Sequence, residues 1–169
     1  MSVVTDQLMK LGATYKVMSH EQAYTPIEEA LALGISADEV VKTIVLDTTA
    51  GHALAVIPGS RRLDLRAAKR AVGAKHVGLA TEEEMEKDFP SYELGAMPPL
   101  GSLRGAPTYV DPDVMRHDTV VFAAGTQTES VKVRTEDLFR NEPVTIAPLT
   151  RLSGAEERLG EQVEAMINA

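Results

Sequence analysis

The sequence predicts an α+β fold, with a mixed, mostly antiparallel sheet and surrounding helices. Predicted strands outnumber predicted helices and occur in adjacent pairs along the chain, which favours this class over a doubly wound parallel sheet. With 169 residues, 44% of them hydrophobic, the chain is long and apolar enough to bury a sizeable core. No repeat or interdomain linker interrupts it, so we expect one domain over residues 1–169.

The N-terminal part of the chain predicts helices and strands in alternation, followed by a hairpin. Thr25, Pro26 and Glu28 form a capping box with proline at the first helical position, and Gly34 ends that helix. The β-branched, apolar stretch that follows is interrupted by Thr49-Ala50-Gly51, which predicts a turn between two strands. The expected elements are a helix at 3–11, a strand at 14–18, a helix at 25–33, a single turn at 36–39, and strands at 41–48 and 52–58.

The second half of the chain is organised around an irregular segment, residues 95–107. Six of its thirteen residues are glycine or proline, which excludes a regular helix or a central strand. Caps and glycine stops predict the elements on either side of it. These are a helix at 64–72, a strand at 75–79, a helix from 81 that closes before Pro90, strands at 108–110, 119–124 and 130–134, a helix at 135–140 capped by Thr135, an edge strand at 144–147, and a C-terminal helix capped at 153–156 that runs to about Asn168.

Lys42 breaks the apolar pattern of its predicted strand. Alternation puts it on the same face as Ile44 and Leu46, which are expected to be core residues. An ammonium among core residues needs a partner or a ligand, and such breaks concentrate at functional sites. In the alternative interpretation Lys42 lies near the strand start and extends to water.

Basic residues are concentrated in one segment of an acidic chain. The formal net charge is −8, yet the stretch 61–75 has six basic residues and one acid, Asp64, so it carries +5 and the rest of the chain −13. A basic element on an acidic body can bind an anionic ligand, although a solvated helix face gives the same pattern. The candidate nucleic-acid-binding residues are Arg61, Arg62, Arg66, Lys69 and Arg70.

Several classes of site are missing from the sequence. There is no cysteine, no phosphate-binding glycine loop and no G-x-S-x-G serine. The four histidines, at positions 20, 52, 76 and 117, lack metal-ligand spacing, so we expect no metal and no cofactor. No apolar run approaches the ~20 residues needed to span a bilayer, and the N-terminus lacks the regions of a signal peptide. We therefore expect a soluble cytoplasmic protein.

Three segments in this order resemble the aminoacyl-tRNA deacylase family of the YbaK/ProX type, which is related to the editing domain of bacterial prolyl-tRNA synthetases. The first is Val41-Lys42-Thr43, opening a strand. The second is the G-x-x-x-P loop from Gly95 to Pro99. The third is the strand at 121–126, which runs into a glycine turn and is followed by the helix start at Thr135. The resemblance covers roughly residues 15–145.

The resemblance implies a trans-editing hydrolase that cleaves the ester of a mischarged aminoacyl-tRNA, with a small amino acid on tRNA-Pro. Lys42 would hold the terminal nucleotide, and Gly95 would offer backbone groups to the aminoacyl moiety. The partners implied are the tRNA 3′ acceptor end and prolyl-tRNA synthetase, with no membrane and no DNA. The implied substrate-binding residues are His20, Thr43, Ala96, Met97, Pro98, Pro99, Ala123 and Gly125.

Two alternatives stay open on the sequence. The same surface could belong to a non-catalytic module that binds tRNA or a synthetase. The chain could also be an unrelated α+β protein, which a large separation between residues 95–107 and Lys42 would favour. Ala123 and Gln127 match positions where some relatives carry polar residues, which leaves the amino-acid specificity open. Alanine, cysteine, serine and threonine all remain candidate substrates.

Overall fold

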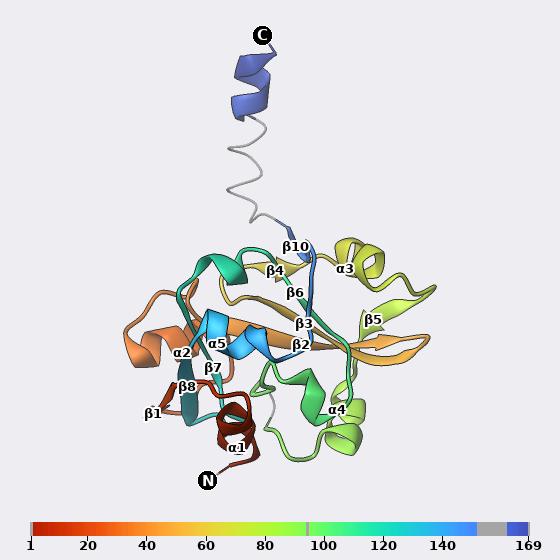
Figure 1. Ribbon diagram of the computed structural model, residues 1–169. Coiled ribbons are helices and arrows are strands. Elements are labelled where there is room, and N and C mark those ends of the chain that lie inside the picture. The colour runs from red at the N-terminus through yellow and green to blue at the C-terminus, as the bar shows by residue number, and fades with distance from the viewer. Residues whose placement is uncertain (1, 94, 152–161, 169) are drawn as a thin grey trace.

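The computed structural model describes residues 2–93, 95–151 and 162–168. A five-stranded sheet, in the order β5-β2-β3-β6-β9, runs through the middle of the molecule, and a three-stranded sheet β1-β8-β7 stands beside it (Figure 1). Most strand pairs are antiparallel, and the two pairs made by β6 are parallel, with β3 and with β9. The predicted α+β class with a mixed, mostly antiparallel arrangement is thus confirmed.

The central element is the hairpin of β2 (Val41–Thr48) and β3 (Gly51–Pro58). Its register is regular from end to end, with Val41 opposite Pro58 and Thr48 opposite Gly51. β5 (Val77–Leu79) pairs only with the last three residues of β2, which leaves the start of β2 without that neighbour. β6 (Thr108–Val110) and β9 (Thr145–Ile146) complete the sheet.

The second sheet packs against the first through the main core. It consists of β1 (Tyr15–Ser19), β8 (Glu129–Arg134) and β7 (Thr119–Ala123). A parallel bridge between Val40 and Val121 joins β7 to the start of β2. Buried side chains from both sheets and from two helices, α1 (Val3–Lys10) and α5 (Thr135–Arg140), form one cluster.

The predicted caps set the limits of the other helices. Thr25 accepts a hydrogen bond from the Glu28 amide at the start of α2 (Pro26–Leu33). Asp64 accepts two at the start of α3 (Leu65–Val72), and Thr81 accepts one at α4 (Glu82–Asp88). α2 and α3 end at Gly34 and Gly73, whose φ angles are +69° and +73°. Within the described ranges, no helix is long and apolar enough to cross a membrane.

Opposite faces of the hairpin carry different helices, and this separation decides where the candidate site residues lie. Leu46 and Ile57 share a core cluster with Ala68 of α3. Val45 and Leu54, on the other face, cluster with Phe89 at the end of α4 and with the loop that follows it. α3 and α4 accordingly lie on opposite sides of β2 and β3 (Figure 1).

Some details differ from the sequence-based expectations. Thr135 does not cap α5, because it is the first helical residue and its hydroxyl donates to the carbonyl of His117. Short elements that the sequence did not indicate are β4 (Arg62–Leu63), which pairs with β10 (Thr150–Arg151), and the 3-10 turns Gly101–Leu103 and Val114–Arg116. Residues 162–167 are helical, as expected, while the predicted cap at 153–156 lies outside the described residues.

Candidate functional site

Gly95 is placed where no other residue fits. Its φ angle is +79°, a left-handed conformation that side chains rarely adopt. A β-carbon built on it would overlap the backbone carbonyl oxygen of Tyr24. The sequence-predicted loop therefore brings its backbone into direct contact with the segment that precedes α2.

Backbone hydrogen bonds join this loop to the turn between β7 and β8. The amide of Gly125 donates to the carbonyl of Ala96 at 3.1 Å, and the amide of Glu93 donates back to the carbonyl of Gly125 at 2.9 Å. The Glu93 carboxylate accepts a further bond from the amide of Gln127 at 2.7 Å. The Gln127 carbonyl in turn accepts from the amide of Ala23 at 2.8 Å, so three segments distant in sequence meet here.

The apolar half of the loop packs on the hairpin. Residues 96–101 are buried. Met97 shares a cluster with Val45 of β2, and Leu100 shares the main core with Val41. The loop thus lies against the strand that carries Lys42, which argues against the unrelated α+β protein.

Two buried hydroxyl oxygens near this loop have no hydrogen-bond partner among the described residues. They belong to Thr43, which alternates between Val41 and Val45 on the loop side of β2, and to Thr126, which follows Gly125. A buried polar atom without a partner costs roughly 1–3 kcal/mol, so such atoms are typical of ligand sites. Thr43 was predicted as a site residue. Thr126 was missed, although a hydroxyl beside a predicted glycine turn was the available signal.

Lys42 is exposed, so the expectation that it is surrounded by core residues is wrong. Alternation puts it on the face of Ile44 and Leu46, opposite the side chains that contact the loop. It lies at the strand start, where β2 has no β5 beside it, and the side chain can reach water. No ion pair of Lys42 occurs in the described part of the chain.

His20 belongs to a buried polar network that the sequence did not indicate. Its Nε2 lies 2.7 Å from the Ser130 hydroxyl, which donates to the carboxylate of Glu29, and its Nδ1 lies 2.6 Å from the Glu21 carbonyl oxygen. A carbonyl can only accept, so Nδ1 carries a hydrogen. Burial raises the pKa of Glu29, and its bonds to Ser130 and the nearby His20 oppose that shift.

The remaining predicted substrate-binding residues line the same region. Ala123 is half-buried at the end of β7, directly opposite Ser130 of β8. Gly125 has a φ angle of +91°, and a β-carbon there would press on the ring of Tyr92. Burial raises the pKa of Tyr92, while the neighbouring Arg104 opposes that shift. Pro98 and Pro99 are buried and hold the loop backbone.

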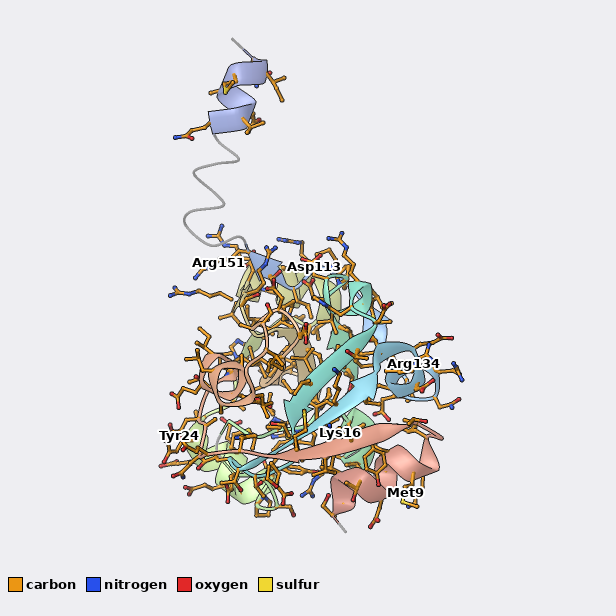
Figure 2. The ribbon with its side chains drawn as sticks, turned by 90° about the vertical axis from the view of Figure 1, so that its left-hand side faces the viewer. Met9, Lys16, Tyr24, Asp113, Arg134 and Arg151 are labelled. Carbon is orange, nitrogen blue, oxygen red and sulfur yellow. The ribbon has the colours of Figure 1, made fainter. Side chains whose placement is uncertain are left out.

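The predicted nucleic-acid-binding residues do not join this region. They lie on α3, on β4 and directly before β4, and α3 covers the face of the hairpin opposite the loop. Figure 2 shows the separation through two labelled residues, Tyr24 and Arg151, which lie at different ends of the molecule. Tyr24 is the neighbour of Gly95, and Arg151 is the strand partner of Arg62. Arg61 is half-buried and forms an ion pair with Asp113 at 3.9 Å. The exposed members are Arg62, Arg66, Lys69 and Arg70.

This arrangement suits substrates that need positioning more than a strong nucleophile. Two buried hydroxyls lie on segments that contact the loop, and the chain has no cysteine. Fixed donors of this kind stabilise the oxyanion of an acyl-transfer reaction, which is often the largest contribution to catalysis. Fold and site together define an α+β domain whose candidate site is built around a glycine- and proline-rich loop.

Comparison with known proteins identifies the family. The profile of the aminoacyl-tRNA editing domain matches residues 20–140, and the chain belongs to that family. The resemblance noted in the sequence is thereby confirmed.

A protein of Enterococcus faecalis (strain ATCC 700802 / V583) is 26% identical over 139 residues, 78% of this chain and 84% of its own length. It bears the name "Putative Cys-tRNA(Pro)/Cys-tRNA(Cys) deacylase EbsC".

Two solved structures are similar over nearly their whole length. A crystal structure described as "a putative trans-editing enzyme for prolyl tRNA synthetase" has a TM-score of 0.76 and 27% identity, covering 90% of this chain and 99% of its own. The hypothetical protein APE2540 has a TM-score of 0.80 and 25% identity, covering 88% and 99%.

Proposed function

We propose that this protein hydrolyses, in trans, the ester that joins a wrong, small amino acid to the 3′ end of tRNA-Pro. Two observations carry the proposal: the close contact of Gly95 with Tyr24, and the buried hydroxyls of Thr43 and Thr126, which have no partner among the residues that the structure describes. Both hydroxyls belong to segments that contact the loop, Thr43 through its neighbours Val41 and Val45 on β2 and Thr126 through the hydrogen bond of Gly125 to Ala96. The family and the names of its relatives support the same reaction.

The chemistry follows from the ester itself. Water attacks the carbonyl carbon, the carbon–oxygen bond to the ribose breaks, and the ribose oxygen leaves as a hydroxyl after taking a proton. The loop backbone around Gly95 would stabilise the oxyanion, and the substrate's own ribose hydroxyl or an ordered water would handle the proton. Aminoacyl esters are already activated, so positioning alone can supply a large share of the acceleration.

The small size of the accepted amino acid would come from the loop side of the site. Ala96 and Met97 are buried there, and Ala123 is half-buried at the end of β7. A difference of one methylene changes discrimination by only about 1–3 kcal/mol, so packing around these residues would tune the choice. The name of the Enterococcus faecalis relative favours cysteine as the first amino acid to test, with alanine, serine and threonine next.

The acceptor end of the tRNA would approach from the side of Lys42. This exposed cation shares its face of β2 with the residues that pack under α3, where Arg66, Lys69 and Arg70 are also exposed. Lys42 lies at the open start of β2, next to Val41, which shares the main core with Leu100 of the loop. A phosphate held by Lys42 would therefore let the terminal adenosine pass around the strand start to the loop face, and α3 would contact the tRNA backbone further along. Prolyl-tRNA synthetase is the partner that such an activity would serve, in the cytoplasm.

The test is deacylation of tRNA-Pro charged with alanine, cysteine, serine or proline, by the wild-type protein and by Lys42→Ala. We expect hydrolysis of one non-prolyl ester, strongly reduced in Lys42→Ala, and no hydrolysis of prolyl-tRNA. Intact esters after long incubation with excess folded protein would instead favour the non-catalytic binding module. Full activity of Lys42→Ala would remove this lysine from the site.

A further inference from the structure

A second cluster of polar side chains lies at the other end of the hairpin from Lys42. Asp47 of β2 and His52 of β3 are direct cross-strand partners. Glu84 of α4 joins them, and one ligand atom from each of the three residues lies within 4.8 Å of the other two. The histidines showed no metal-ligand spacing in the sequence because this set is assembled from three separate elements.

The imidazole of His52 is held in place on two sides. Its Nε2 lies 2.8 Å from a carboxylate oxygen of Asp88, and its ring meets the ring of Phe89 edge-on, with centroids 5.4 Å apart. Metal-binding histidines commonly donate their second ring N–H to a carboxylate in this way, which fixes the tautomer that leaves the other nitrogen free.

The other ring nitrogen of His52, Nδ1, is buried and makes no hydrogen bond of normal geometry within the described residues. The Leu46 carbonyl interacts with the ring, but no hydrogen bond of normal geometry joins it to Nδ1. A buried nitrogen in this state is the second sign of a ligand, independent of the surrounding carboxylates.

The charge around His52 also favours a cation. α4 has five carboxylates and one lysine, Lys87, and Asp47 adds a sixth acid from the hairpin. Acidic residues alone attract cations diffusely. A nitrogen ligand oriented by Asp88 distinguishes this cluster, because imidazole suits zinc and similar metals, whereas magnesium and calcium prefer oxygen only.

We propose that Asp47, His52 and Glu84 bind one transition-metal dication of the zinc type. Metal–ligand bonds of about 2.0–2.2 Å require ligand atoms to lie about 3.3 Å apart, so the three side chains would close inward on binding. Three protein ligands would leave the fourth tetrahedral position to water. The bound ion would fasten α4 to the hairpin, and α4 leads through Phe89 into the Gly95 loop.

The experiment titrates ZnCl₂ into the untagged, full-length protein after chelator treatment, by calorimetry, and records the melting temperature with and without zinc. We expect one saturable equivalent and a rise in melting temperature of several degrees, because a ligand that binds only the folded state stabilises it. His52→Gln and Glu84→Gln should each weaken binding at least tenfold and abolish the thermal shift. MgCl₂ should give neither signal at the same concentration.

Matched controls separate a built site from a diffuse acidic surface. Glu83→Gln removes one carboxylate from the same turn of α4 as Glu84→Gln does. His76→Gln removes an exposed histidine outside the cluster. Each control should change the zinc affinity less than twofold. Non-saturable binding, unaltered affinity in both His52→Gln and Glu84→Gln, or equal losses in Glu83→Gln and Glu84→Gln would each overturn the proposal.

Discussion

The carbonyl oxygen of Tyr24 occupies the space that a β-carbon on Gly95 would need. This contact brings the segment before α2 against the glycine- and proline-rich loop. Because the φ angle of Gly95 is also left-handed, two separate constraints restrict this position to glycine.

Gly95→Ala tests that contact. The substitution should cost about 1–2 kcal/mol for the left-handed conformation alone, and the collision with Tyr24 should displace the loop. We expect deacylation to fall at least ~100-fold, because small displacements of positioning groups are that costly. Gly105→Ala is the matched control, since Gly105 has a φ angle of +63° but no atom near its would-be β-carbon. It should lose stability and keep its activity, and equal loss of activity in both variants would contradict the assignment.

Thr43→Val and Thr126→Val remove buried hydroxyls that have no partner among the described residues. Each variant should be as stable as the wild type or up to ~1 kcal/mol more stable, because a buried unsatisfied group disappears. Deacylation should fall about tenfold or more, since the hydroxyls would bind substrate. Urea unfolding and single-turnover deacylation measure both effects.

Thr48→Val is the control for these hydroxyls. The Thr48 hydroxyl donates to the Gly51 carbonyl at 2.6 Å in the hairpin turn. This variant should lose ~1 kcal/mol of stability and retain activity. A loss of stability in Thr43→Val equal to that in Thr48→Val would show that Thr43 serves the fold.

Lys42→Ala should separate activity from stability. Lys42 is exposed, so the free energy of unfolding should change by less than ~0.5 kcal/mol. Deacylation should drop by about 100-fold or more if the lysine places the terminal nucleotide. Lys16→Ala, at an exposed strand lysine on β1, should change neither quantity (Figure 2).

Arg66→Gln and Arg70→Gln, combined, test the basic face of α3. The affinity for tRNA falls as salt rises, and the magnitude of the slope of log affinity against log salt should decrease by about 0.7–0.9 for each phosphate that the protein no longer neutralises. Binding of tRNA at several salt concentrations measures that slope. Lys132→Gln, an exposed cation on β8, should leave the slope unaltered. An unaltered slope in the double variant would show that α3 is a solvated helix face.

Glu29→Gln should change how stability depends on pH. The pKa of Glu29 is raised above 4.5, chiefly by burial. Between pH 4.5 and the folded pKa, the folded state therefore holds a proton that the unfolded state has released. This carboxyl therefore contributes most stability below pH 4.5, and the contribution declines as pH rises through the folded pKa. Glutamine cannot ionise, so the stability of Glu29→Gln relative to wild type should increase with pH over that window.

Urea unfolding from about pH 4 to pH 8 measures this difference, with Glu28→Gln as the control. Glu28 is an exposed neighbour on the same helix, so Glu28→Gln controls for the loss of one carboxylate from α2. A pH profile of Glu29→Gln parallel to that of the wild type would show that the network with Ser130 and His20 does not couple to folding.

The sequence determined the local structure. Thr25 and Gly34 delimit α2, Asp64 and Gly73 delimit α3, and the Thr49-Ala50 turn separates the hairpin strands, because caps and turns depend on residues within a few positions of each other. The same holds for the irregular loop and the α+β class, which follow from glycine, proline and the order of apolar runs.

The tertiary structure determined which residues come into contact. Alternation gave the face of Lys42, but its exposure depends on β5 ending before it reaches the start of β2. Glu29 and Ser130, or Asp47 and Glu84, come together only because strands and helices far apart in sequence pack against each other. Such contacts depend on the long-range register of the sheets and on which face each helix covers, and no local pattern in the chain encodes either.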